Sequence, residues 1–543
     1  MTHDIPVLIV GGGPVGLCAA IFLARHGVRS ILVERHPSTT NHPKARGFYK
    51  RTMEALRPCA IEPALRAASL PQGAWRFVWM DALTGRELRQ VAPAGRDRPG
   101  PHSPTYICAA SQDSFETELL RHARSYPEID IRFRTELLAF TQDDHAVAAT
   151  IRDRPTGTTS NISAAYMIGA DGGASTVRHA LGIAMQGQSL IGDNVNIHFR
   201  AELAPWVAQR RALGYFFARD YTRLLWAGGT DRWIFLRPIR PDRGEKPEDF
   251  THERCIEYVR EVVGIPDLPV EIINLLFWTL AADTAERFRT GRVFLAGDAA
   301  HRLPPTGGFG ANTGIQDVHN LAWKLAFVLH GHAPPTLLDT YEPERKPVAE
   351  SNIAFSLTNI SRAREVMRRM AEGAEGALAA ALADQLKHLD SDGQDLGFRY
   401  DGAAITPDGT PPPGGDSQTY IPSARPGSRA PHFWLKPKDG TAPISTLDLF
   451  EKTFTLLTTP QGTTWHTAAR QAASTIGLQL TTHSIGPGGD FEPIEGNWTA
   501  LYGLAPDGAI LIRPDGHVAW RSPVADPSPE PILEAALRNA VGL

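Results

Sequence analysis

The chain has 543 residues, 42% of them hydrophobic and 21% charged, and carries a formal net charge of −4 at pH 7. This composition is typical of a globular protein and leaves room for about three or four domains. Because the charge is close to neutral and the chain has no basic stripe and no acidic tail, we expect no nucleic-acid partner.

The cysteines and apolar segments predict a protein whose thiols are reduced and which does not enter a membrane. The cysteines form no C-x-x-C pair, and they are Cys18, Cys59, Cys108 and Cys255. We therefore expect buried or incidental thiols and no metal site. The apolar stretch 7–24 is interrupted by glycines and follows no positively charged segment, so it predicts a buried strand, turn and helix. The protein is expected to be cytoplasmic, as a monomer or homodimer.

The N-terminal residues have the pattern of a nucleotide-binding turn. Residues 5–10 are continuously apolar, as in a parallel strand buried on both faces, and a helix and a second strand follow. The turn GGGPVG between them fits G-x-G-x-x-G through Gly11, Gly13 and Gly16. Glu34 ends the second strand, where an acid accepts hydrogen bonds from an adenosine ribose. The combination predicts a dinucleotide site but does not distinguish NAD from FAD.

The middle of the chain is predicted to extend this unit and then to insert an antiparallel sheet. Residues 73–104 are irregular, a helix follows the N-cap Ser111, and residues 129–152 alternate like strands. A further strand ends in a turn with Asp171 and Gly172. The segments that look like short strands between turns are 194–199, 213–217, 221–226 and 232–236.

A second glycine-rich turn lies at residues 291–317, where a short apolar strand leads to a Gly-Asp step, a loop of Gly and Pro, and a helix start. An aspartate between small residues, here Asp298, suits a polyol chain. The helix that begins near Asn312 would point its positive end at a ring that becomes anionic when reduced. Helical sequence continues to residue 387 with a break near Pro343, and a Pro/Gly/Ser linker then leads to a small α/β domain.

The three motifs, in this order, resemble those of the single-component FAD monooxygenases, the flavin-dependent aromatic hydroxylases. That family combines GxGxxG, then DG, then GD with a P-x-G-G-x-G-x-N-type loop, and the resemblance covers residues 1 to about 400. The C-terminal stretches SARPGSRAPHFWL, STLDLF and LIRPDGHVAWR look like the thioredoxin-like extension of the larger phenol and polyketide hydroxylases. No cysteine follows Cys255, so this extension is expected to be structural.

The resemblance implies an α/β fold. Residues 1–181 and 286–400 would form a Rossmann-like FAD-binding domain, and residues 182–285 an inserted antiparallel-sheet substrate domain, which residues 75–105 would join. Residues 401–424 would be a linker and residues 425–543 a thioredoxin-like domain without redox cysteines.

The resemblance also implies which residues hold FAD. They are Gly11, Gly13, Pro14, Val15, Gly16, Glu34, Arg35, Arg46, Gln112, Asp171, Gly172, Gly297, Asp298, Pro305, Gly308, Gly310, Ala311 and Asn312. Among them, Asp298 would bind the ribityl chain, and Arg46 and Pro305 would lie near the flavin. The chemistry implied is reduction of FAD by NADPH or NADH, which binds transiently, and transfer of oxygen from a flavin hydroperoxide to an aromatic ring. No catalytic side chain is strictly required. His301 is a candidate base or a loop residue.

The substrate is expected over the inserted sheet, where the aromatic candidates are Tyr215, Phe217, Trp226, Trp233 and Phe277. Such aromatics more often belong to a core. The resemblance implies a planar aromatic or polyketide substrate, in antibiotic biosynthesis or aromatic catabolism. Two alternatives stay open: Baeyer–Villiger-type insertion of oxygen into a C–C bond, and a low-turnover flavoprotein that stabilises a reactive pathway intermediate.

Overall fold

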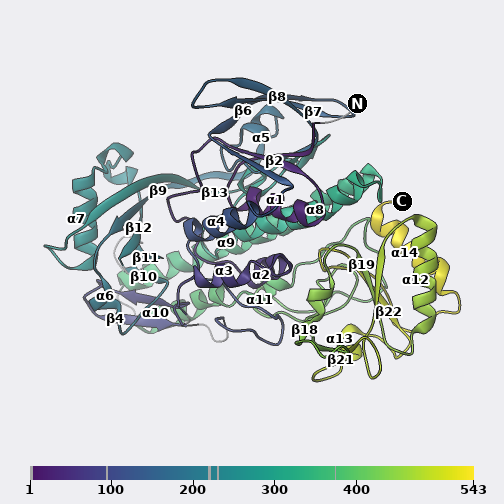
Figure 1. Cartoon of the computed structure of the whole chain (residues 1–543). Coiled ribbons are helices and arrows are strands. Elements are labelled where there is room, and N and C mark those ends of the chain that lie inside the picture. Colours follow the sequence, from purple (N-terminus) through teal and green to yellow (C-terminus); the bar gives the residue numbers. More distant parts are fainter. Residues whose placement is uncertain (1–3, 72, 93–95, 218–221, 229–230, 373–374) are drawn as a thin grey trace.

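The computed structural model describes residues 4–543 except 72, 93–95, 218–221, 229–230 and 373–374. Within this range the strands form two large sheets and two small ones. The fold is α/β, with a Rossmann-like domain, an antiparallel-sheet region and a small C-terminal α/β domain (Figure 1). The exact domain limits given above stay a prediction.

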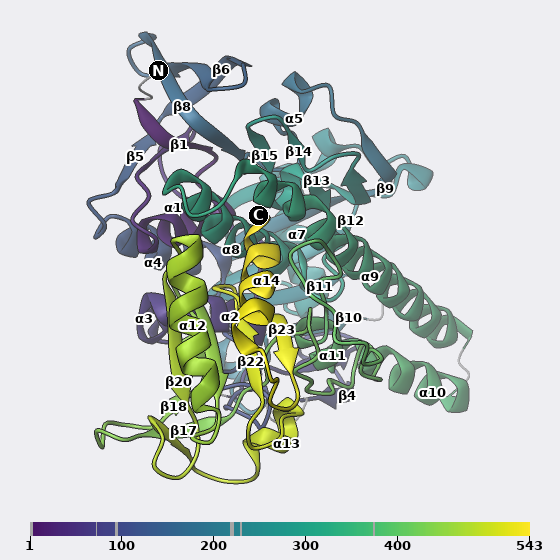
Figure 2. The same cartoon turned by 90° about the vertical axis from the view of Figure 1, so that its right-hand side faces the viewer.

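The first large sheet has a parallel core that is buried on both faces. Its parallel strands are, in spatial order, β15 (Val293–Leu295), β8 (Thr159–Gly169), β1 (Ile5–Val10), β2 (Ser30–Glu34) and β5 (Ile129–Phe133). The antiparallel strands that extend it are β14 (Arg289–Thr290), β6 (Thr135–Gln142) and β7 (Val147–Asp153). The helices in this part of the chain are α1 (Pro14–Arg25), α2 (Lys50–Leu56), α3 (Glu62–Ala67), α4 (Gln112–Ala123), α5 (Thr176–Ala180) and α8 (Gly310–Leu329). Among them, α1 and α8 pack against each other (Figure 2).

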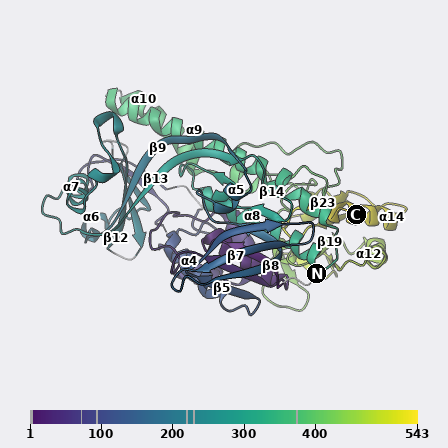
Figure 3. The ribbon, with the colours of Figure 1, turned by 90° about the horizontal axis from the view of Figure 1, so that it is seen from above.

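The second large sheet combines segments that are far apart in the sequence. In spatial order its strands are β16 (His301–Arg302), β13 (Glu271–Ala285), β9 (Met185–Arg200), β12 (Arg232–Pro238), β11 (Arg223–Gly228), β10 (Gly214–Phe217), β3 (Phe77–Met80) and β4 (Glu87–Val91). The long strands β9 and β13 run from the first unit into this one (Figure 3). The helices α6 (Ala204–Val207) and α7 (His252–Val263) accompany the sheet.

Two local expectations need correction. Residues 73–104 are not wholly irregular, because β3 pairs in parallel with β10 and β4 pairs with β3. Two of the predicted strands are also longer than expected, β9 and β12. The strand β9 covers 16 residues, since its N-terminal part pairs with β13 on a solvent-facing stretch that lacks a hydrophobic signal. Of the predicted strand 221–226, residue 221 lies outside the described residues.

Helices α9 (Tyr341–Glu372) and α10 (Glu375–Gln385) lie beside the second sheet. The predicted helix break near Pro343 falls where the 3-10 turn η5 (Pro335–Thr340) gives way to α9. Pro343 itself lies in the first turn of α9, where a missing N–H breaks no helical hydrogen bond.

The C-terminal domain begins after α11 (Asp392–Leu396) and an extended segment. Its strands are β17 (Trp434–Pro437), β18 (Ile444–Ser445), β19 (Phe454–Thr458), β20 (Leu480–Ser484), β21 (Phe491–Pro493), β22 (Ala509–Ile512) and β23 (Val518–Ser522). Its helices are α12 (Thr463–Ile476), α13 (Trp498–Tyr502) and α14 (Pro529–Val541), of which α12 and α14 pack together (Figure 2). Trp323 of α8 lies in one apolar cluster with Phe454 and Leu537, so this domain shares a core with the unit built on the first large sheet.

Buried ion pairs add to this shared core. Glu344 of α9 accepts hydrogen bonds from Lys324 of α8 at 2.7 Å and from Arg513 of the C-terminal domain at 2.7 and 2.8 Å. All three side chains have 0% exposure. Burial would raise the pKa of Glu344, but Arg513 and Lys324 outweigh it and lower the pKa to about 2.

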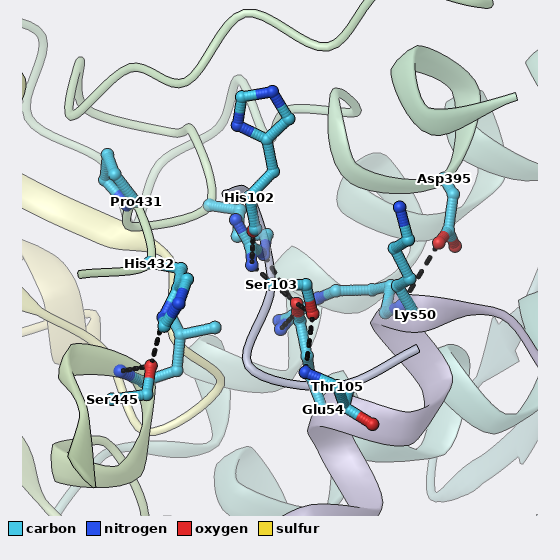
Figure 4. A network of polar contacts seen from close by, with 12 residues as sticks. Lys50, Glu54, His102, Ser103, Thr105, Asp395, Pro431, His432 and Ser445 are labelled. Carbon is cyan, nitrogen blue, oxygen red and sulfur yellow. Dashed lines mark hydrogen bonds and ion pairs between the residues drawn. The ribbon is translucent and has the colours of Figure 1, made fainter. Parts of the chain in front are cut away.

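A second buried pair joins α2 to the start of the C-terminal domain. Arg429 donates to Glu54 at 2.5 and 2.8 Å, and the exposures of the two side chains are 0% and 2%. Ser103 also donates to Glu54 at 2.6 Å, and within the C-terminal domain His432 lies 2.7 Å from Ser445 (Figure 4). Of these contacts, the Arg429–Glu54 pair holds the C-terminal domain against the unit built on the first large sheet.

Two further observations concern the whole of the described chain. The four cysteines are buried and free, as expected. Among the described residues, no helix combines the length and apolarity needed to cross a membrane.

Replacing Arg429 with Met should destabilise the protein strongly, because buried Glu54 then loses its two-bond guanidinium partner and keeps only the Arg51 guanidinium, at 3.3 Å. Removing one partner of such a pair costs about 3–5 kcal/mol. Arg538→Met is the matched control: it breaks a partly exposed pair with Glu534 and should cost at most about 0.5 kcal/mol. Thermal unfolding followed by circular dichroism measures both, and equal shifts in the two variants would contradict the expectation.

Candidate functional site

A cavity of about 1270 Å³ lies between the two large sheets. The turns after β1, β2, β8 and β15 form one end of it, and strands of the second sheet with α9 form the other. The N-terminal residues of two helices also line it: Pro14 of α1, and Gly310 and Ala311 of α8. Their free N–H groups and helix dipoles favour an anionic ligand at this end.

The glycine turn after β1 leaves its backbone open to the cavity. Gly11 has φ +112°, and a Cβ there would overlap the Ala170 carbonyl. A Cβ on Gly16 would overlap the Gly11 carbonyl, so this residue lets α1 pack on the turn and does not itself line the cavity. A Cβ on Gly13, in contrast, would meet no described atom within 4 Å. Gly13 therefore offers room for a phosphate close to the main chain.

Glu34 lies beside this turn as the fingerprint requires. Its carboxylate accepts hydrogen bonds from the backbone N–H of Gly12 at 2.7 Å and of His36 at 2.8 Å, and it lines the cavity with Arg35. The acid expected to bind a ribose is thus oriented by the main chain of the turn. Asp171 also lines the cavity and accepts from Ser175 and from the Val177 N–H, which holds the start of α5. Val15 and Gly172 complete this part of the wall.

Gln112 and Arg46 approach the cavity from the side of α4. Gln112 accepts from the Ala45 N–H at 3.1 Å and donates to Glu116 at 2.6 Å. Arg46 donates to the carbonyls of Trp226 at 2.9 Å and Pro43 at 3.2 Å. Burial lowers the pKa of Arg46 to about 10, so its guanidinium stays charged at neutral pH.

The second glycine-rich turn presents one carboxylate to the cavity. Asp298 is exposed and lines the cavity, while its neighbours Gly297 and Ala299 are buried. Gly297 has φ +60° and lies behind the turn rather than on the cavity wall: a Cβ there would come within 2.9 Å of Val15. The close approach of α1, α8 and this turn therefore sets where Asp298 points.

His301 is not at the cavity surface. It is fully buried, and its Nε2 lies 2.6 Å from Asp317 of α8. Asp317 also accepts from the Gly297 N–H at 3.1 Å and from Arg345 of α9 at 2.9 Å. His301 thus holds the turn that carries Asp298. This position fits the predicted loop role, and the His301 ring cannot act as a base inside the cavity. Asp317 and Arg345 were not predicted from the sequence. They lie 28 residues apart on two helices, and no sequence pattern shows that their side chains meet.

The loop before α8 is held in place by hydrogen bonds from buried side chains, which either do not face the cavity or lie at its edge. Pro305, Gly307 and Gly308 line the cavity. Asn312 is fully buried and does not line it: its amide donates to Gly308 O at 2.7 Å and accepts from the Tyr49 N–H at 2.8 Å. Tyr49, also missed from the sequence, donates to the Gly307 carbonyl.

The second sheet turns a different set of residues to the cavity than the sequence analysis selected. Tyr215, Trp226 and Trp233 are at most 6% exposed, belong to the core beneath α7 and do not line the cavity. Phe217 and Phe277 do line it, although Phe217 also packs in that core. Successive side chains of a strand alternate between the two faces of the sheet. The residues that follow Tyr215 and Trp233 in the chain therefore point to the cavity face. One row across the paired strands consists of Trp79, Phe216, Arg223, Leu236, Asn196 and Leu276, all on the cavity wall.

Comparison with known proteins identifies this arrangement. A family model described as an FAD binding domain matches residues 4–356, and a model described as aromatic-ring hydroxylase, C-terminal, matches residues 423–543. The chain belongs to the FAD-dependent aromatic-ring hydroxylases. The described site fits that cofactor, since an open glycine backbone, the Glu34 carboxylate, two helix N-termini and an exposed Asp298 face one cavity. The protein is an FAD-dependent monooxygenase, and its cofactor is FAD.

Relatives of this aromatic-ring hydroxylase cover its whole length. The tetracenomycin A2 monooxygenase-dioxygenase of Streptomyces glaucescens is 38% identical over 555 residues, which cover 96% of this chain and 94% of that protein. The flavin-dependent monooxygenase PieE, solved with FAD and substrate, is 33% identical with a TM-score of 0.93, covering 100% of both chains. Aklavinone-11 hydroxylase, solved with FAD and aklavinone, is 34% identical with a TM-score of 0.87, also covering 100% of both.

Replacing Asp298 with Ala should weaken FAD retention, because the turn then presents no carboxylate to a polyol. Loss of a charge-assisted hydrogen bond predicts roughly a 10- to 100-fold rise in the Kd of FAD. Flavin fluorescence during titration of the apoprotein measures it. Asp193→Ala, on β9 and outside the cavity wall, is the control. Unchanged retention in Asp298→Ala would remove the assignment of this residue.

Proposed function

We propose that this monooxygenase hydroxylates a planar, polycyclic aromatic substrate of the polyketide class, with NADPH or NADH as reductant. The observation that carries the proposal is the wall opposite the FAD end. There Trp79 and Phe216 stack with ring centroids 5.0 Å apart and an interplanar angle of 11°, and both face the cavity. Similarity to the aklavinone-11 hydroxylase and the tetracenomycin A2 monooxygenase-dioxygenase supports the substrate class.

We propose the following division of the cofactor-binding residues. Gly11, Gly13 and Glu34 hold the adenine-side half of FAD, and Asp298 with the start of α8 holds the ribityl chain and the pyrimidine edge of the flavin. Pro305 and Gly308 lie along the ring, and Arg46 lies near it. When bound and reduced by the nicotinamide nucleotide, FAD supplies the oxygen-activating chemistry.

The side chains of this protein position the reactants. Asp317 fixes the turn that carries Asp298, and the described wall opposite consists mainly of apolar and aromatic groups that exclude water. On α9, Asn359, Ala363 and Val366 recur at helical spacing and close the cavity on that side. A flat aromatic compound between α9 and the sheet is held in a fixed orientation, which is what selective hydroxylation requires.

Turnover with a panel of aromatic compounds tests the proposal. We expect planar polycyclic phenols to stimulate NADPH or NADH oxidation and to gain one oxygen atom from labelled O₂ on the ring, as read by mass spectrometry and NMR. A product with oxygen inserted into a C–C bond would point instead to the Baeyer–Villiger reaction. Tight binding of polycycles without stimulated oxidation would contradict turnover and favour a flavoprotein that stabilises an intermediate.

Replacing Phe216 with Ala should weaken binding of planar polycycles roughly 3- to 10-fold, because an aromatic contact contributes about 0.5–1.5 kcal/mol. FAD retention should be unchanged, since Phe216 belongs to the second sheet. Equilibrium dialysis of the FAD-loaded protein measures the affinity. Trp206→Phe changes a 38% exposed aromatic outside the cavity and is the control. Equal affinity in Phe216→Ala and the unaltered protein would show that the ring lies elsewhere.

A further inference from the structure

One charged side chain stands in the aromatic wall of the cavity. Arg223 of β11 pairs across the sheet with Phe216 of β10 on one side and with Leu236 of β12 on the other. Its guanidinium lies 5.5 Å from the centroid of the Phe216 ring. Because residues of one row share a face, Arg223 points into the cavity with Phe216 and Trp79.

Arg223 has no hydrogen bond and no ion pair to any residue that the structure describes, and its ring contact with Phe216 is its one recorded interaction. Two other arginines of the cavity, Arg46 and Arg302, differ in this respect. Arg46 donates to two backbone carbonyls, and Arg302 forms an ion pair with Asp283. Burial lowers the pKa of Arg223 to about 10, which still leaves the guanidinium charged at neutral pH.

The acids that line the described cavity wall lie at its other end. They belong to the first sheet and its adjoining turns and helix, and they are Glu34, Glu116, Glu136, Asp171 and Asp298. The wall around Arg223 is built from Trp79, Phe216, Leu236 and Asn196, which are uncharged. Arg223 is half-buried, and a cation partly withdrawn from water without a charged partner gains from a ligand that supplies the opposite charge.

We propose that Arg223 binds a carboxylate on the polycyclic aromatic substrate and so selects anionic substrates. The inference rests on the proposed function, whose substrate class it narrows. The flat aromatic part of the compound would lie on Trp79 and Phe216, and the planar guanidinium beside them presents parallel N–H donors to a carboxylate. An ionised phenol also carries a negative charge, but it has one acceptor oxygen where a carboxylate has two. The experiment below distinguishes a carboxylate from a phenolate.

Binding of three matched probes to the FAD-loaded protein tests this assignment. The probes are anthraquinone-2-carboxylate, its methyl ester and 2-hydroxyanthraquinone, and equilibrium dialysis gives the Kd of each. We expect the carboxylate to bind roughly 10- to 100-fold more tightly than the ester, as a charged hydrogen bond predicts. Arg223→Met should abolish this preference while leaving the Kd of the ester nearly unchanged, and Arg223→Lys should keep part of it.

The control variant is Arg132→Met, which removes a partly exposed arginine of β5 that pairs with Asp130. It should retain the full preference for the carboxylate. Equal binding of carboxylate and ester by the unaltered protein, or a preference that survives Arg223→Met, would overturn the proposal. A preference for 2-hydroxyanthraquinone that depends on Arg223 would also overturn the carboxylate and assign the site to an ionised phenol.

Measuring nicotinamide oxidation and oxygen incorporation with the same probes tests this proposal separately from the proposed function. If the neutral ester stimulates nicotinamide oxidation and gains oxygen without any effect of Arg223, the hydroxylase function stands and the anion site falls. If the carboxylate binds through Arg223 but no polycycle stimulates oxidation or gains oxygen, the anion site stands and hydroxylation falls.

Discussion

The buried carboxylate of Asp317 ties the cofactor end of the cavity to the rest of the molecule. It lies on α8 and receives the Gly297 N–H, the His301 ring and the Arg345 guanidinium, all from different elements. Burial would raise the pKa of Asp317, but His301 and Arg345 outweigh it and hold the pKa below its ordinary value. A charged acid at this depth persists because each of its oxygens has a partner. The turn that carries Asp298 therefore has one position relative to α8.

The same network reaches the C-terminal domain. Arg345 also donates to the Tyr400 hydroxyl at 3.2 Å, and the Tyr400 ring lies 4.1 Å from that of His517. The pairs of Glu344 with Arg513 and of Glu54 with Arg429 bind the domain at two more places. A thioredoxin-like unit without redox cysteines is thus built into the core of the monooxygenase. Its contribution to the site is indirect, through the helices that hold the glycine-rich turns.

The substrate end follows from the pleat of the second sheet. Phe216 faces the cavity, while Tyr215 next to it in the strand lies in the core. Moving one position along the strand therefore changes a residue from the cavity wall to the core. Sequence reasoning recognised that aromatic strands were present and selected Tyr215, Trp226 and Trp233. It had no means of deciding the face, because both faces of these strands are mainly apolar: one packs on α7 and the other lines the cavity.

The sequence by itself determined the family and the cofactor, and it predicted the two ends of the cofactor site. The glycine turn, Glu34, Asp171 and Asp298 are local signals, since a tight turn and a helix start need particular residues at fixed spacing. Only the tertiary structure decided which side chains face the cavity and which hold it from behind. His301, Asp317, Arg345 and Asn312 act through partners far away in the chain, and Arg223 is distinctive because the described fold brings it no partner. Such properties arise from long-range packing and strand register, which no local pattern records.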